Sequence, residues 1–86
     1  MTTAEKLELA LACLEPQHLV IRDDSALHAG HAGNTGGGHY TITIVSSHFE
    51  GLSLLKRHRL VYHAAATLMK QDIHALSIQA KTPQET

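Results

Sequence analysis

Residues 39–45 read HYTITIV, and this stretch decides the fold class. Apolar side chains alternate there with threonine hydroxyls, a period typical of a strand with one buried face. The apolar positions are Tyr40, Ile42 and Ile44. Two further β-branched stretches, HLVIR at residues 18–22 and HALSIQA at residues 74–80, also indicate strands. The chain is therefore predicted to hold three strands.

A helix is predicted ahead of the first strand. Thr2 and Glu5 have the spacing of a capping box, and Pro16 disfavours continuation of the helix beyond Glu15. The apolar stripe of this helix consists of Leu7, Ala10, Leu11 and Leu14. Cys13 lies beside this stripe and is expected to be a buried or half-buried thiol.

A second helix is predicted from the N-cap Ser53 to about Lys70. Its expected buried stripe is Leu54, His58, Val61, Ala65 and Leu68, widened by Leu55, Tyr62 and Met69. We interpret His58 as a core histidine that makes a hydrogen bond. The opposite side is basic and consists of Lys56, Arg59, His63 and Lys70. That side is either a solvated helix face or a surface for a phosphate-rich partner.

The predicted order is α-β-β-α-β, an α+β domain with both helices on one face of a three-stranded sheet. The first two strands are expected to form an antiparallel hairpin. A right-handed connection through the second helix would make the second and third strands parallel, so the sheet is predicted to be mixed. We predict one domain over residues 1–86, with a flexible Gly/His-rich loop at 24–38 and a polar tail at 82–86.

Composition favours binding over catalysis. The chain has 86 residues, a net charge of −1 and one cysteine, which excludes an internal disulfide and a cysteine-only metal site. No nucleophile elbow, phosphate-binding loop or pair of carboxylates in an apolar stretch is present. No apolar stretch approaches the ~20 residues that span a bilayer, and the N-terminus lacks a basic signal region. A cytoplasmic protein that is not an enzyme is predicted.

The eight histidines are the unusual feature of the composition. His28, His31 and His39 lie in or beside the glycine-rich loop, and neutral imidazole is a good ligand for Zn and Fe. A zinc-binding loop and a merely solvated loop both fit this pattern. His74 begins the third strand, where a side chain is held rigidly and stays accessible, so a ligand role and a structural role both stay open.

Two longer motifs resemble the BolA-like protein family. The first is HFEGLSLLKRHRLVYHA at residues 48–64, in which Phe49 and Gly51 precede an Arg-His-Arg-x-Val-Tyr segment. The second is HALSI at residues 74–78, followed by Lys-Thr-Pro at 81–83. The resemblance covers nearly the whole chain and is firmest from His39 to Pro83.

This resemblance implies a fold similar to the class II KH domain and a function without catalysis. It implies that the chain binds a monothiol glutaredoxin and that a 2Fe–2S cluster is shared with that partner and glutathione, with none tightly bound when the chain is alone. His74 would be one ligand of the cluster. The second would come from the loop: His28 is favoured and His31 is the close rival. The chain would be a monomer or a weak homodimer.

The family also implies an alternative, a DNA-binding transcriptional regulator that uses Lys56, Arg57 and Arg59. The residues Gly51-Leu52-Ser53-Leu54 lack the second glycine of the GxxG turn with which KH domains clamp single strands. The alternative therefore concerns double-stranded DNA along the basic helix.

Overall fold

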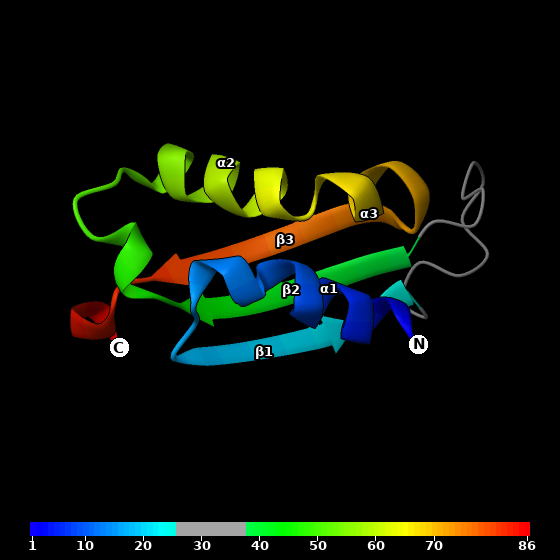
Figure 1. Ribbon diagram of the computed structural model, residues 1–86, viewed down its shortest axis with the longest axis horizontal. Coiled ribbons are helices and arrows are strands. Elements are labelled where there is room, and N and C mark those ends of the chain that lie inside the picture. The colour runs from blue at the N-terminus through cyan, green and yellow to red at the C-terminus, as the bar shows by residue number, and fades with distance from the viewer. Residues whose placement is uncertain (26–37) are drawn as a thin grey trace.

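The computed structural model describes residues 1–25 and 38–86, so His28 and His31 lie outside the described residues. The chain forms three α-helices, three strands and three short 3-10 turns in these parts (Figure 1). In chain order they are α1 (Thr3–Leu11), η1 (Ala12–Leu14), β1 (His18–Asp23), β2 (Gly38–Val45), η3 (Ser47–Phe49), α2 (Leu54–Ala64), α3 (Ala66–Gln71), β3 (Ile73–Lys81) and η4 (Pro83–Glu85).

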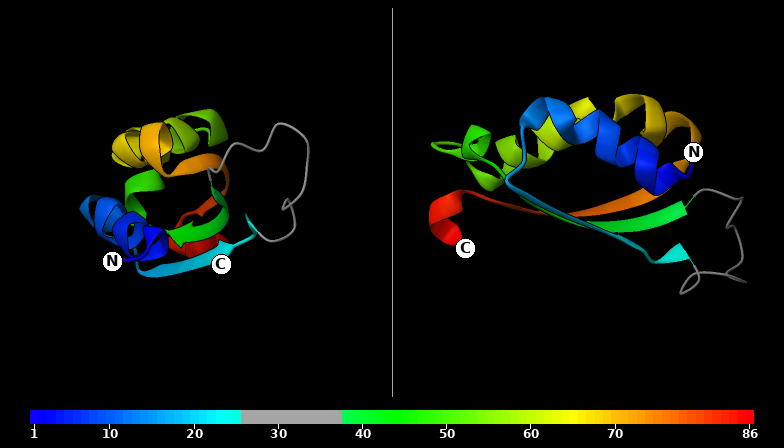
Figure 2. Two further views of the ribbon diagram at one scale, coloured as in Figure 1. Left: turned by 90° about the vertical axis from the view of Figure 1, so that its right-hand side faces the viewer. Right: turned by 60° about the horizontal axis from the view of Figure 1, so that its bottom comes forward.

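The sheet has the predicted mixed topology. Its strand order is β1-β2-β3, with β1 antiparallel and β3 parallel to β2. Ile42 lies opposite Ile21 on one side and opposite Ile78 on the other. The helices cover one face of the sheet, and the other face is left open (Figure 2). The α+β architecture is therefore confirmed, whereas the likeness to a class II KH domain stays a prediction.

The core lies between the helices and the covered face of the sheet. Its fully buried side chains are Leu7, Leu11, Ile42, Ile44, Phe49 and Val61. The capping box predicted at Thr2 and Glu5 is present in both directions. Gly51 has a φ of 77° in the turn before α2, a left-handed conformation that favours glycine.

The second helix differs from its prediction in length and in orientation. It is interrupted at Ala65, which separates α2 from α3. Leu54 and Leu55, expected in the buried stripe, are 66% and 59% exposed. Val61, Ala65 and Leu68 are buried as predicted, and Arg57 completes their face toward the start of α2. Apolar periodicity misplaced only the first part of the stripe, because the buried position there is taken by an arginine.

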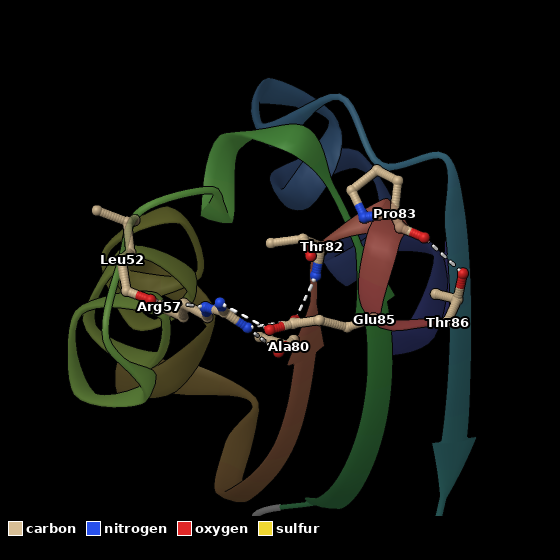
Figure 3. Close-up of polar contacts among 7 residues, drawn as sticks. All are labelled: Leu52, Arg57, Ala80, Thr82, Pro83, Glu85 and Thr86. Atoms are coloured by element: carbon tan, nitrogen blue, oxygen red, sulfur yellow. Dashed lines mark hydrogen bonds and ion pairs between the residues drawn. The ribbon is translucent and has the colours of Figure 1, made fainter.

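Arg57 is buried because its guanidinium has enough acceptors around it (Figure 3). Nε donates to the Leu52 carbonyl at 3.0 Å, and Nη1 donates to the Ala80 carbonyl at 3.1 Å. Both Nη atoms also reach the Glu85 carboxylate, at 2.6 and 3.1 Å. A buried charge is tolerated when it is paired and its donors are satisfied in this way.

The tail at residues 82–86 is folded against this arginine. Thr82 is buried, and with Glu85 it forms a capping box around η4, in which Glu85 accepts from the Thr82 N–H at 2.8 Å. The guanidinium and this backbone N–H lower the pKa of Glu85 from 4.5 to about 2. The polar composition of the tail does not predict this order.

Two local predictions are wrong. Cys13 is exposed and donates a weak hydrogen bond to the Ala10 carbonyl at 3.4 Å, because the chain has turned into η1 at that point. His58 is half-buried, and no hydrogen bond joins its ring to another residue of the described chain. Neither residue belongs to the core.

Candidate functional site

The candidate site lies where β2 and β3 begin. Parallel strands start at the same end of a sheet, so His39 in β2 and His74 in β3 come together there. This is also the end at which the segment between β1 and β2 joins the sheet (Figure 1). The sequence placed both histidines at strand starts, but only the strand pairing makes them neighbours.

His74 owes its position to an irregularity in the ladder. Gly38 pairs with Ile73 and His39 pairs with Ala75, so His74 is an extra residue without a partner in β2. Such a bulge re-aims the side chain of the residue that it carries. Ile73 is buried and His74 is exposed.

The two imidazole rings lie with their centres 5.2 Å apart and their planes tilted by 43°. A metal–nitrogen bond is about 2.1 Å, so two imidazoles on one tetrahedral ion have ring centres roughly 5 Å apart. The observed separation therefore fits two nitrogen ligands on a single ion. Among the described residues, no hydrogen bond holds the His74 ring in another role.

The backbone beside the pair is fixed by hydrogen bonds on both sides of residues 26–37. The His39 N–H donates to Ser25 Oγ at 3.0 Å, and the Asp24 N–H donates to the His39 carbonyl at 2.7 Å. The Gly38 N–H donates to the Asp72 carbonyl at 3.0 Å. His39 is thus held at its backbone independently of its ring.

Asp24 and Gly38 stabilise the same region in two ways, by hydrogen bonds of the Asp24 carboxylate and by the absence of a side chain at Gly38. Asp24 accepts from Arg22 Nε at 2.7 Å and from the Thr41 hydroxyl, which binds the end of β1 to β2. A Cβ at Gly38 would collide with the ring of the buried Tyr40. Glycine is therefore required two residues before Tyr40, next to the bulge.

The predicted ligands are only partly brought together. The structure places His74 at the site and adds His39 beside it, whereas His28 and His31 lie outside the described residues. The sequence indicates His39 only as a ligand of a zinc-binding loop. Residues 1–25 and 38–86 contain no group of three or more metal-ligating side chains. Because parallel strands start at the same end of a sheet, the parallel pairing predicted for the second and third strands indicates that His39 and His74 lie near each other.

The predicted nucleic-acid surface needs a correction at Arg57. Lys56 and Arg59 are exposed on α2, but Arg57 is buried with its guanidinium bound to Glu85 and two carbonyls. All three nitrogens of its guanidinium donate to groups of the chain itself, so Arg57 does not present its guanidinium to a phosphate. The exposed side of α2 also carries Leu54 and Leu55, which a phosphate-binding surface does not require.

Comparison with known proteins decides the family. Residues 11–85 match the family described as "BolA-like protein". The chain belongs to the BolA-like family. The solved structure of BolA1 from Arabidopsis thaliana is similar with a TM-score of 0.87 and 46% identity, covering 100% of this chain and 97% of that one.

Two curated relatives show how far this likeness extends. Protein BOLA1, chloroplastic, from Arabidopsis thaliana is 52% identical over 77 residues, which are 85% of this BolA-like chain and 48% of that protein. The DNA-binding transcriptional regulator BolA of Escherichia coli is 33% identical over 86 residues, which are 99% of this chain and 80% of that protein. The chain thus spans about half the length of the Arabidopsis relative.

The comparison does not confirm the predicted cytoplasmic location, because the Arabidopsis relative is named as chloroplastic. In the parts of this BolA-like chain that the structure describes, every helix is too short or too polar to cross a bilayer. The cytoplasmic location therefore stays a prediction.

Proposed function

We propose that this BolA-like chain is a non-enzymatic adaptor that donates histidine ligands to a 2Fe–2S cluster shared with a monothiol glutaredoxin and glutathione. His74 is the first ligand. The single observation that carries the proposal is the exposed imidazole of His74, at a bulge in the ladder, whose ring centre lies 5.2 Å from that of His39 where β2 and β3 begin.

The second ligand comes from the same end of the sheet. The family resemblance favours His28, with His31 as its rival, and the structure adds His39 as a third candidate because of its distance from His74. If His74 and a second histidine of this chain held such a cluster, its remaining protein-side ligands would have to be thiolates. A partner that brings thiolates supplies the chemistry that this chain, with one cysteine on a distant helical turn, lacks.

The chemistry that such a cluster supplies when bound follows from its ligands. Two imidazoles on one iron raise the reduction potential relative to four thiolates. The residues of this chain hold the rings in place: the bulge positions His74, and the bonds of Ser25 and Asp24 to the His39 backbone position β2. Coordination requires a neutral imidazole, so assembly is expected to weaken as the pH falls.

Visible circular dichroism tests the proposal. The chain is mixed with a monothiol glutaredoxin, glutathione, iron and sulfide, and the spectrum is compared with that of the glutaredoxin alone. We expect a distinct spectrum for the wild type, lost or altered in His74→Ala. His63→Ala, which removes an exposed histidine from α2, is the matched control and should leave the spectrum unchanged.

The loop assignment follows from the same experiment with His28→Ala, His31→Ala and His39→Ala. The variant that reproduces the effect of His74→Ala identifies the second ligand. A wild-type spectrum identical to that of the glutaredoxin alone would contradict the adaptor function. A spectrum that His74→Ala leaves unchanged would contradict the role of His74.

DNA binding is the second candidate function, and one observation favours it: the Escherichia coli relative is named a DNA-binding transcriptional regulator. On this chain the exposed cations Lys56 and Arg59 of α2 would contact phosphates. Each phosphate contact contributes about 0.9 to the slope of log affinity against log salt. The double variant Lys56→Ala/Arg59→Ala should therefore flatten that slope by roughly 2, and Lys6→Ala on α1, outside this surface, is the control. A slope that the double variant leaves unchanged would contradict this surface.

A further inference from the structure

The two edges of the sheet differ in how their backbone is protected. In β3 the N–H and C=O groups of alternate residues face away from β2. Side chains of α2 donate hydrogen bonds to two of these carbonyls. The Tyr62 hydroxyl donates to the Leu76 carbonyl at 2.9 Å, and Arg57 Nη1 donates to the Ala80 carbonyl at 3.1 Å. Side chains of a helix thus bind two of the outward carbonyls of the β3 edge, and covering an edge is one way in which proteins avoid pairing with another strand.

The β1 edge has no such cover in the part of the chain that the structure describes. The Asp24 N–H donates to the His39 carbonyl, and the antiparallel register continues through Arg22 opposite Thr41. Because orientation alternates along a strand, the N–H and C=O groups of Leu19 and Ile21 face away from β2. No hydrogen bond from another described residue reaches these groups.

A groove runs along this edge, between α1 and β1, with a volume of about 590 Å³. Its walls are mainly apolar: Ala4, Leu9, Ala12, Pro16, Leu19 and Ile21. Leu9 is 62% exposed, although it is a large apolar side chain on a short helix. Outward backbone groups beside an apolar groove are the two features by which a sheet edge accepts an added strand.

The charge at the groove is negative. Glu5 and Glu8 also line it. Hydrogen bonds with Thr2 lower the pKa of Glu5, and its carboxylate, like that of an ordinary glutamate, is ionised at neutral pH. The neighbouring cation Lys6 points elsewhere, to Asp72 at 3.5 Å. Among the described residues no ion pair neutralises Glu8.

These features select one kind of occupant. A second copy of this chain, paired through β1 about a two-fold axis, would bring Glu5 and Glu8 of both copies to the same interface. A strand with lysine or arginine among its groove-facing residues instead packs its methylene groups on Leu9 and extends its charge to Glu8. Apolar residues at the other groove-facing positions would contact Leu19 and Ile21.

We propose that the β1 edge binds an extended segment of a partner protein, whose groove-facing side chains are apolar except for at least one lysine or arginine. The segment pairs with the outward backbone groups of Leu19 and Ile21. This site lies on the edge strand farthest from β3 and leaves His74 exposed, so it does not depend on the cluster proposal.

The test uses the full chain and a blocked synthetic peptide, Thr-Val-Thr-Lys-Thr-Val-Thr, followed by amide NMR and hydrogen exchange. We expect saturable shifts along β1 and slower exchange of the Leu19 and Ile21 amides. Glu8→Lys should weaken binding by about fivefold, the scale of an exposed ion pair, and should favour a peptide with glutamate in place of lysine. Glu50→Lys changes the net charge equally at an exposed turn outside the groove and should have no effect.

Three outcomes would overturn the proposal. The first is the absence of a saturable shift along β1, or shifts at β3 in its place. The second is equal binding of the lysine and glutamate peptides to the wild type. The third is a concentration dependence of the β1 shifts without peptide, which would show that a second copy occupies this edge.

Discussion

The two ends of the sheet differ in how their polar side chains are bonded. Where β2 and β3 end, Arg57 donates to two carbonyls and to the Glu85 carboxylate, through contacts of 2.6 to 3.1 Å that are buried or part-buried. Where the same strands begin, His39 and His74 lie close together and the His74 side chain is exposed. One end ties its polar side chains into the fold, and the other leaves at least one of them, His74, exposed to solvent.

This difference indicates how a small domain separates stability from binding. A chain of 86 residues has a thin core. The hydrogen bonds between the tail and the buried Arg57 are therefore expected to contribute a substantial part of its free energy of unfolding. An exposed side chain on a bulge, such as that of His74, can then contribute little to the free energy of unfolding. The comparison yields three predictions, from the largest expected effect on stability to the smallest.

Arg57→Met should have the largest effect. The apolar part of the side chain is retained, but the carbonyls of Leu52 and Ala80 lose a donor and Glu85 loses its partner. We expect the free energy of unfolding to fall by about 3 kcal/mol, measured by urea denaturation followed by far-UV circular dichroism. Arg59→Met, at an exposed position of the same helix, should cost less than about 0.5 kcal/mol. Equal losses for both variants would contradict a specific role of the Arg57 network.

Glu85→Gln should have a smaller effect that depends on pH. The pKa of Glu85 is lowered to about 2 in the fold, so its carboxylate stabilises the native state above its ordinary pKa of 4.5. That stabilisation is lost as the pH falls from 4.5 to about 2. The melting temperature of the variant should therefore be lower than that of the wild type at pH 7, and the difference should shrink across this range.

Glu50→Gln, in the exposed turn before α2, is the matched control for Glu85→Gln and should show no such pH-dependent difference. A melting temperature of Glu85→Gln that differs from the wild type equally at pH 7 and at pH 3 would show that the ion pair is not the cause.

His74→Ala should have the smallest effect on stability. Its side chain is exposed and lacks a strand partner, so the unfolding free energy should change by less than about 0.5 kcal/mol. Leu76→Ala, two residues along the same strand and buried, should cost about 2–4 kcal/mol. A large loss of stability in His74→Ala would mean that this end of the sheet also depends on its polar side chains.

The sequence predicted the sheet well and the long helix less well. Alternation in HYTITIV identifies β2 because its period is strictly two, and the right-handed crossover rule then makes β3 parallel to it. Val61 is buried as predicted, but the first turn of α2 was misjudged because apolar periodicity assigns leucines to the core and an arginine to solvent. Leu54 and Leu55 are exposed and Arg57 is buried, since the acceptors that satisfy Arg57 come from distant parts of the chain.

The candidate site was predictable only in part. His74 stands out in the sequence as a histidine at the start of a strand, and its motif carries the family resemblance. The predicted parallel pairing puts His39 at the same end of the sheet, but their contact could not be predicted without the register of β2 and β3. One extra residue in β3 decides which side chains meet. The order of the tail depends on Glu85 reaching Arg57, a contact 28 residues apart that no local pattern encodes.

The backbone bonds that flank residues 26–37 have a consequence for protein engineering. Asp24, Ser25 and Gly38 are each tied to a neighbouring element by a backbone N–H or a side-chain hydroxyl. The two ends of the segment are therefore fixed by the sheet itself, and doubling the length of a closed loop costs only about 0.6 kcal/mol. The intervening residues can be exchanged for a segment of different length or ligand content while β2 and β3 keep their register. This end of the sheet is thus a grafting point at which His39 and His74 keep their places while the residues between β1 and β2 are replaced.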